Sequence, residues 1–98
     1  MPRHKFTAHA QNDLANIIDY TLQNWGAAQA EKYIDGLESL AAKLAHSPAL
    51  GTRRDALQKG LLSFPYESHV LYYTRTKAGI TIFRVIHQGM NPANLSPL

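Results

Sequence analysis

Seven side chains in the second half of the chain could do chemistry or bind a charged partner. These candidate site residues are cationic, titratable or phenolic: Arg53, Arg54, His69, Tyr73, Arg75, Arg84 and His87. An imidazole exchanges a proton near neutral pH, and a guanidinium holds a phosphate or a carboxylate. RNA cleavage would need such a base, cations for the phosphate and an acid for the leaving oxygen. The same side chains would equally suit a surface that binds an acidic protein or nucleic acid.

Two of these residues, Arg84 and His87, stand three positions apart in the stretch ITIFRVIHQGMNP, residues 80–92. The guanidinium of Arg84 could pair with Glu67 or Asp55 at a sheet edge, or it could face a partner. For His87, a structural place at the end of a strand is favoured over catalysis. On the helices, we expect Asp13 to be solvated and Trp25 to lie in the core.

Composition predicts no metal site and no cofactor. The chain has no cysteine, and its five histidines do not recur at the fixed spacing of metal ligands. The net charge of +3 permits an acidic partner but lies far below that of a dedicated DNA-binding protein. No leader segment or membrane-length apolar run is evident, so we expect a cytoplasmic protein without membrane contact.

Strand patterns position most of the candidate residues. Residues 68–76 and 80–87 are rich in β-branched and aromatic side chains and are joined by a turn at Gly79. Uninterrupted alternation on the last strand predicts two faces. One face would carry Ile80, Ile82, Arg84 and Ile86, and the other Thr81, Phe83, Val85 and His87. Residues 61–67 suggest an edge strand, because Pro65 cannot donate a ladder hydrogen bond.

Two helical patterns precede these strands. Apolar side chains recur with a 3.6-residue period over residues 8–24 and again from residue 30 to about His46. Thr7 is a suitable N-cap, Gly26 a suitable joint and Pro48 a stop. A short strand at 4–7 would come first, and residues 47–60 would be a loop. The expected fold is α+β, in the order β-α-α-β-β-β. An antiparallel helical hairpin would pack on a small, mainly antiparallel sheet in a single domain, residues 1–98.

Four motifs, in order along the chain, resemble the ParE branch of the RelE/ParE toxin superfamily. The first motif consists of Ala10, Asp13, Leu14, Ile17 and Tyr20. The second consists of Trp25, Gly26, Gln29, Ala30, Tyr33 and Leu37. The third consists of Leu44, Ala45, Pro48, Gly51 and Arg53, and the fourth of HVLYY (69–73) with IxIxRVIHQGM (80–90). The resemblance implies the same β-α-α-β-β-β fold.

The resemblance also implies a function and partners. ParE-like toxins poison DNA gyrase by protein–protein binding, without catalysis, and thereby block DNA replication. They are silenced by a ParD-like antitoxin, so a toxin–antitoxin hetero-oligomer is expected. RelE-like members instead cleave messenger RNA on the ribosome, and this is the alternative function. Such nucleases carry a denser basic set, whereas the residues after His87 include no Arg, Lys or Tyr. The seven candidate residues would then bind the target or the antitoxin.

Overall fold

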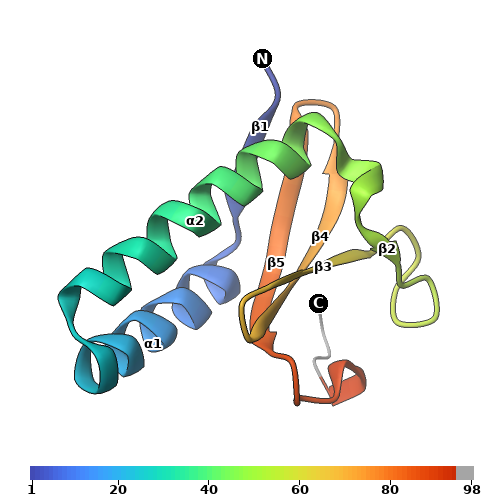
Figure 1. Cartoon of the computed structure of the whole chain (residues 1–98). Coiled ribbons are helices and arrows are strands. Elements are labelled where there is room, and N and C mark those ends of the chain that lie inside the picture. The colour runs from blue at the N-terminus through green and yellow to red at the C-terminus, as the bar shows by residue number, and fades with distance from the viewer. Residues whose placement is uncertain (95–98) are drawn as a thin grey trace.

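The fold is a helical hairpin packed against a five-stranded sheet, as Figure 1 shows. The computed structural model describes residues 1–94. The helices are α1 (Ala8–Trp25) and α2 (Ala27–His46). The strands are β1 (Arg3–Phe6), β2 (Thr52–Arg53), β3 (Leu62–Tyr66), β4 (His69–Thr76) and β5 (Gly79–His87), and the 3-10 helices are η1 (Pro48–Leu50) and η2 (Pro92–Asn94). The expected α+β fold is confirmed, with the two-residue strand β2 added inside the predicted loop.

The strand order β1-β5-β4-β3-β2 brings the two ends of the chain into one sheet. Strand β1 runs parallel to β5, and the other neighbouring pairs are antiparallel. At the start of β5, Gly79 has φ 148° and lies so close to the backbone of Arg3 that a Cβ atom would collide with it. A glycine is therefore required where β1 meets β5.

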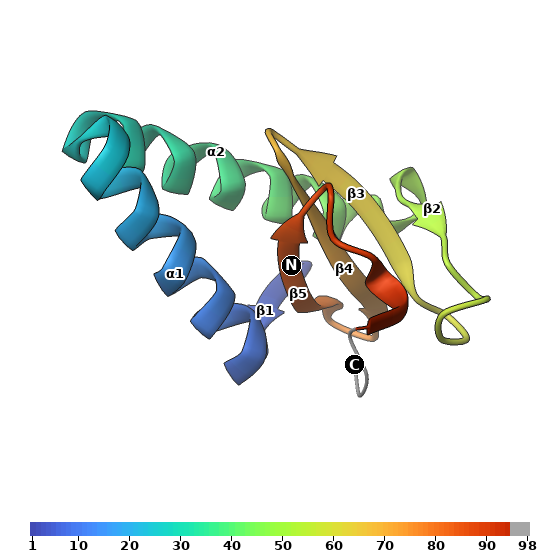
Figure 2. The ribbon, with the colours of Figure 1, turned by 90° about the horizontal axis from the view of Figure 1, so that it is seen from below.

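Local signals set the bounds of the helical hairpin. The Thr7 hydroxyl accepts a hydrogen bond from the Ala10 amide at 3.2 Å, which caps α1. Gly26 takes φ 89° and is the sole residue between α1 and α2. Seen from below, the joint of the two helices lies away from the sheet (Figure 2). Trp25, at this joint, is 72% exposed, so the prediction that it lies in the core is wrong.

A bulge in β5 divides the strand into two halves, and the alternation of side chains between the two faces of the sheet is reversed from one half to the other. Tyr72 pairs with Arg84 and Tyr73 pairs with Ile82, so Phe83 is the extra residue. Ile82 and Val85 therefore both join the core beneath the helices, whereas Ile86 packs with Leu61 and Tyr72 in a second cluster. The predicted uninterrupted alternation is wrong after Phe83.

Gly36 in α2 makes room for a side chain from the sheet. A Cβ atom at this position would collide with the hydroxyl of Tyr66, which donates a 2.7 Å hydrogen bond to the Tyr33 carbonyl. The close approach at Gly36 is therefore between a helix and a strand. Within residues 1–94, neither helix is both long and apolar enough to cross a membrane.

Candidate functional site

The candidate residues separate into three environments. Arg53 and Arg75 line a groove at the β2 edge, and His69 and His87 line a second groove beside the helical hairpin. Tyr73 and Arg84 are held in internal contacts. The sequence alone suggests one surface, but the fold distributes its charged residues over two.

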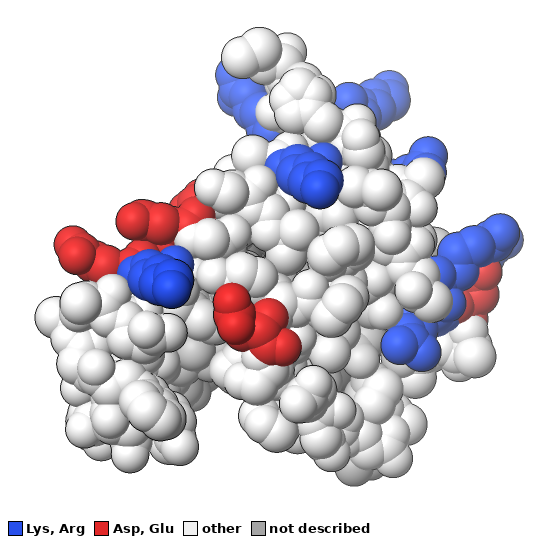
Figure 3. All heavy atoms as spheres, in the orientation of Figure 1, with Lys and Arg blue, Asp and Glu red and all other residues white. Residues whose placement is uncertain are grey.

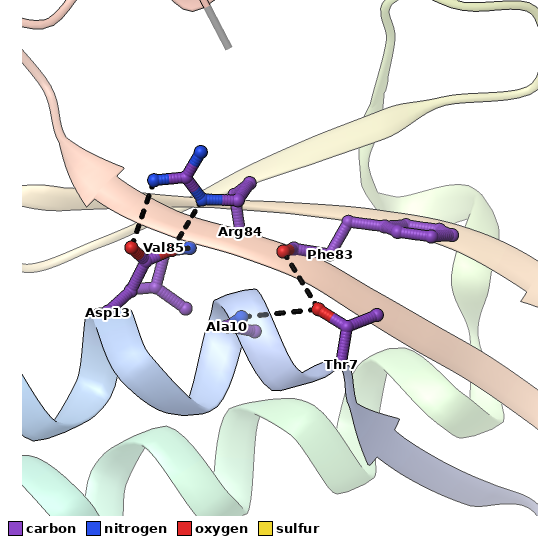
Figure 4. A network of polar contacts seen from close by, with 6 residues as sticks. All are labelled: Thr7, Ala10, Asp13, Phe83, Arg84 and Val85. Carbon is purple, nitrogen blue, oxygen red and sulfur yellow. Dashed lines mark hydrogen bonds and ion pairs between the residues drawn. The ribbon is translucent and has the colours of Figure 1, made fainter. Parts of the chain in front are cut away.

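Arg84 is clamped to the first helix. Its Nε and Nη2 atoms donate to the two carboxylate oxygens of Asp13 at 2.7 and 3.0 Å, and the Val85 amide donates to the same carboxylate at 3.0 Å (Figure 4). The side chains of Arg84 and Asp13 are 18% and 12% exposed. This hydrogen-bonded pair raises the pKa of Arg84. Asp13 is thus not solvated as expected, and it takes the place of the suggested partners Glu67 and Asp55.

The contacts of Asp13 with Arg84 and Val85, here called the clamp, continue the line of contacts between β1 and β5. Pairing between the two strands ends at Phe6 and Ile82, and there the Thr7 amide donates to the Ile82 carbonyl at 3.0 Å. The Thr7 hydroxyl then donates to the Phe83 carbonyl at 3.1 Å, as Figure 4 shows. Asp13 finally accepts from Val85. Residues at the start of α1 therefore satisfy the β5 backbone where β1 no longer reaches it.

Tyr73 lies wholly in the core, which corrects its assignment to a binding surface. Its side chain is fully buried, and its hydroxyl donates to the Pro48 carbonyl at 2.7 Å. Burial raises the pKa of Tyr73, so its phenol stays neutral. Tyr73 therefore anchors η1 to the sheet and is not available to a partner.

The histidine groove lies between α1, α2 and the ends of β4 and β5. It has a volume of about 740 Å³ and is lined by Asn16, Ile17, Tyr20, Thr21, Trp25, Gln29, Tyr33, Glu67, Ser68, His69 and His87. His69 and His87 face each other across the ladder with ring centroids 5.8 Å apart. The Gly89 amide donates to Nδ1 of His87 at 3.0 Å, so the neutral His87 ring carries its proton on Nε2.

Two buried polar atoms of this groove have no hydrogen-bond partner within the described chain. They are the hydroxyl of Tyr33 and Nδ1 of His69. Burial, aided by Tyr66 and Glu67, raises the pKa of Tyr33, so the phenol remains protonated. Burial, aided by His87, lowers the pKa of His69, so this ring is neutral at physiological pH. Orphaned buried polar groups are uncommon in folded proteins and often mark functional positions.

The basic groove lies at the opposite end of the sheet. It has a volume of about 590 Å³ and is lined by Ala49, Gly51, Arg53, Asp55, Lys59, Gly60, Leu61, Leu62, Thr74 and Arg75. In Figure 3, Lys and Arg side chains lie both at the top of the molecule and on the side where β2 lies, whereas most acidic side chains in this view lie over α2 or beside it. Arg54 lies outside the lining, with its Nε donating to the Ser63 hydroxyl at 2.9 Å.

Asp55 moderates the charge of the basic groove. It pairs with Arg53 at 2.8 Å and accepts a hydrogen bond from the Gly60 amide at 2.9 Å. The Gly60 bond and, to a lesser degree, Arg53 lower the pKa of Asp55. The Arg53 side chain is 81% exposed, so this ion pair is weak and leaves the guanidinium open to a partner.

Sequence reasoning missed the aromatic part of the histidine groove. Tyr20 and Trp25 are large and largely exposed, and with Tyr33 they make one wall aromatic. The sequence signal for this wall was the position of Trp25 at the end of α1, where the helix extends beyond the sheet that covers it. Among residues 1–94, no cluster of three or more His, Cys, Asp or Glu side chains could hold a metal ion.

Comparisons with known proteins give the family. The family model for the ParE toxin of the type II toxin–antitoxin system parDE matches residues 5–92. Toxin ParE1 of Caulobacter vibrioides is 33% identical over 91 residues, which cover 93% of this chain and 94% of that protein. Toxin ParE1 of Mycobacterium tuberculosis is 34% identical over 90 residues, which cover 91% of this chain and 92% of that protein.

Solved structures show the same fold. A chain of the chromosomal ParDE toxin–antitoxin system of P. aeruginosa aligns with a TM-score of 0.73 and 21% identity over 89% of this chain and 96% of its own. A chain of the YoeB–YefM complex of Staphylococcus aureus aligns with a TM-score of 0.58 and 20% identity over 90% and 98%. With the sequence matches spanning nearly its whole length, the chain belongs to the ParE toxin family of type II toxin–antitoxin systems.

Proposed function

We propose that this toxin acts in the cytoplasm by binding DNA gyrase, that it blocks DNA replication without catalysing a reaction, and that a ParD-like antitoxin neutralises it. The observation that carries the proposal is the separation of the candidate residues. A catalytic site needs its base, acid and cations within hydrogen-bond reach of one substrate. Here the arginines of the basic groove and the histidine pair lie at opposite ends of the sheet.

The contacts of Arg84 disfavour the alternative, an endoribonuclease of the RelE type. Among the described residues, no Lys or Arg lines the histidine groove, and Arg84, the nearest candidate in sequence, is engaged by Asp13. A phosphate at the histidine pair would thus lack the cations that stabilise its transition state. The groove also presents Glu67, whose charge repels a phosphate.

The two grooves suggest that gyrase and the antitoxin bind at different places on the toxin. The basic groove presents Arg53, Lys59 and Arg75 and suits an acidic surface of the target. The histidine groove is framed by exposed aromatic side chains and suits a segment of the antitoxin, since aromatic residues are enriched where proteins bind one another. On this proposal the antitoxin leaves the basic groove of the toxin free.

One paired assay tests the function. The purified chain is incubated with gyrase, ATP and plasmid, and in parallel with translating ribosomes. Loss of supercoiling or accumulation of cleaved plasmid, with intact messenger RNA, is expected. RNA cut at codon positions, with unaffected supercoiling, would establish the nuclease instead.

Charge reversal tests the basic groove. The variant Arg53→Glu, Arg75→Glu should lose gyrase inhibition and still bind the antitoxin encoded by the neighbouring reading frame. The matched control is Lys5→Glu, Lys32→Glu, which makes the same change in net charge at exposed positions outside this groove. Equal inhibition by the wild type and the Arg53, Arg75 variant would exclude this groove as the target surface.

A further inference from the structure

Within residues 1–94, the histidine groove has no Lys or Arg side chain in its lining, although the protein is basic overall. The chain has ten Lys and Arg residues, yet among the described residues none lines this groove, whose one fixed charge is Glu67. The aromatic rings of Tyr20, Trp25 and Tyr33 line it as well. Aromatic faces attract cations, and the more strongly the less water competes. The groove therefore combines aromatic surface with one carboxylate and lacks the cations that fill the basic groove.

The orphaned atoms of the groove also suit a donor. Tyr33 is 8% exposed, and its neutral hydroxyl has free lone pairs because no described group donates to it. Nδ1 of His69 is likewise without a partner, and in a neutral imidazole one ring nitrogen is an acceptor. Both atoms are already removed from solvent, so a small movement of Tyr33 and His69 toward the groove would let a bound N–H donor supply the missing hydrogen bonds without a further cost of desolvation.

Resting on the proposed pairing with an antitoxin, we propose that the histidine groove binds a cationic side chain, arginine or lysine, of the antitoxin segment. The cation lies against Trp25 and Tyr20 and pairs with the Glu67 carboxylate. Its N–H groups donate to the lone pairs available at Tyr33 and His69. A carboxylate in the same place would be repelled by Glu67 and would find no Lys or Arg among the residues lining the groove.

His69 gives this binding a pH dependence of known sign. The groups that face the histidine pair are Tyr33 from α2, Tyr20 from α1 and Glu67 from the β3–β4 turn. Protonation of His69 places a positive charge beside the bound cation. A cationic occupant therefore binds more tightly above the pKa of His69, which burial lowers, than below it, and an anionic one would show the reverse.

The proposal is tested on the free chain, without any antitoxin. The probes are N-acetyl-arginine amide, N-acetyl-norleucine amide and N-acetyl-glutamate amide, which differ only in the side chain. Trp25 is the single tryptophan, so its indole N–H resonance in ¹H–¹⁵N NMR spectra reports occupancy of the groove. The arginine probe should give saturable shifts with a dissociation constant in the millimolar to tens of millimolar range.

Variants then identify the contacts. Glu67→Gln should weaken the arginine probe roughly 2–5-fold, in line with one partly exposed ion pair. Asp19→Asn, the same charge change at an exposed position on α1 outside the groove, should leave the affinity unchanged. Lowering the pH from neutral through the folded pKa of His69 should also weaken the arginine probe.

Each other result overturns the proposal. Equal binding of the norleucine probe would make the groove an apolar anchor site, and tighter binding of the glutamate probe would make it an anion site. The absence of saturable shifts with the arginine probe up to roughly 100 mM would mean that the groove takes no such side chain. Because these titrations need neither gyrase nor an antitoxin, their failure is separate from failure of the supercoiling assay.

Discussion

The ion pair between Asp13 and Arg84 should contribute more to stability than any surface pair of this chain. Asp13 accepts three hydrogen bonds from Arg84 and Val85, with both charged side chains largely buried. The variant Asp13→Ala leaves a guanidinium and a strand amide without a partner, which costs about 3 kcal/mol. The variant Arg84→Ala leaves the carboxylate with the Val85 amide and should cost about 2 kcal/mol. A chain of this size is stable by about 5–15 kcal/mol, so either change is large.

Urea denaturation of the two single variants and the double variant measures the pair itself. Urea is chosen because guanidinium would screen the charges. A coupling free energy of about 1.5–3 kcal/mol is expected, with unchanged m-values. The matched control is the Arg53–Asp55 pair, which has the same chemistry but side chains 81% and 42% exposed. Its coupling should stay below about 0.5 kcal/mol.

A coupling for Asp13 and Arg84 as small as that of the exposed pair would refute the reasoning from burial and geometry. The same variants also resolve the role of Arg84 in toxicity. Arg84→Ala is expected to weaken toxicity, and on the structural explanation Asp13→Ala weakens it in proportion to its own loss of stability. Full toxicity of Arg84→Ala at normal folded yield would exclude any role of this residue. Loss of toxicity in Arg84→Ala alone would indicate direct contact with the target.

Three further predictions concern the groove and the packing of α2. Tyr33→Phe should raise the free energy of unfolding by up to about 1 kcal/mol, because it removes a buried hydroxyl without a partner. Tyr66→Phe should lower the free energy of unfolding by about 1 kcal/mol, because it removes the hydrogen bond to the Tyr33 carbonyl. Equal effects of the two variants in urea denaturation would contradict this assignment. Because burial lowers the pKa of His69, the unfolded chain binds the proton first as the solution is acidified. Stability should therefore fall as the pH drops from neutral toward the folded pKa of His69. His69→Gln should flatten that slope in thermal melts and His9→Gln, an exposed position, should not. Gly36→Ala should lower stability by about 1–3 kcal/mol although alanine favours helix, because the added methyl displaces the Tyr66 hydroxyl; a gain in melting temperature would show that helix propensity dominates.

Much of the fold could be predicted because its signals are local. The bounds of the helices follow from Thr7, Gly26 and Pro48, each of which acts through its own backbone and immediate neighbours. The strands follow from residue composition over a few positions. Strand β2 was missed because two residues, Thr52 and Arg53, carry too little pattern to indicate pairing.

The candidate site was predicted less well because it depends on distant contacts. Asp13 and Arg84 are 71 positions apart, and nothing in either neighbourhood indicates the other. Trp25 has the spacing of a core residue, but its burial depends on whether the sheet extends beneath the end of α1. It does not, so the apolar face of the helix continues into solvent at Leu22 and Trp25. The same circumstance creates the aromatic wall of the histidine groove.

One inserted residue in β5, Phe83, affects both the lining of the histidine groove and the contacts of β5 with Thr7 and Asp13. With strict alternation, Ile86 would follow Ile82 toward the helices and His87 would face away. The bulge at Phe83 reverses this, so that Val85 enters the core and His87 lies in the groove opposite His69. It also falls where β1 ends, so the β5 backbone beyond it is free to bond Thr7 and Asp13 on the first helix. A strand bulge thus fixes which side chains the groove presents, and the clamp on α1 holds the wall opposite them in place.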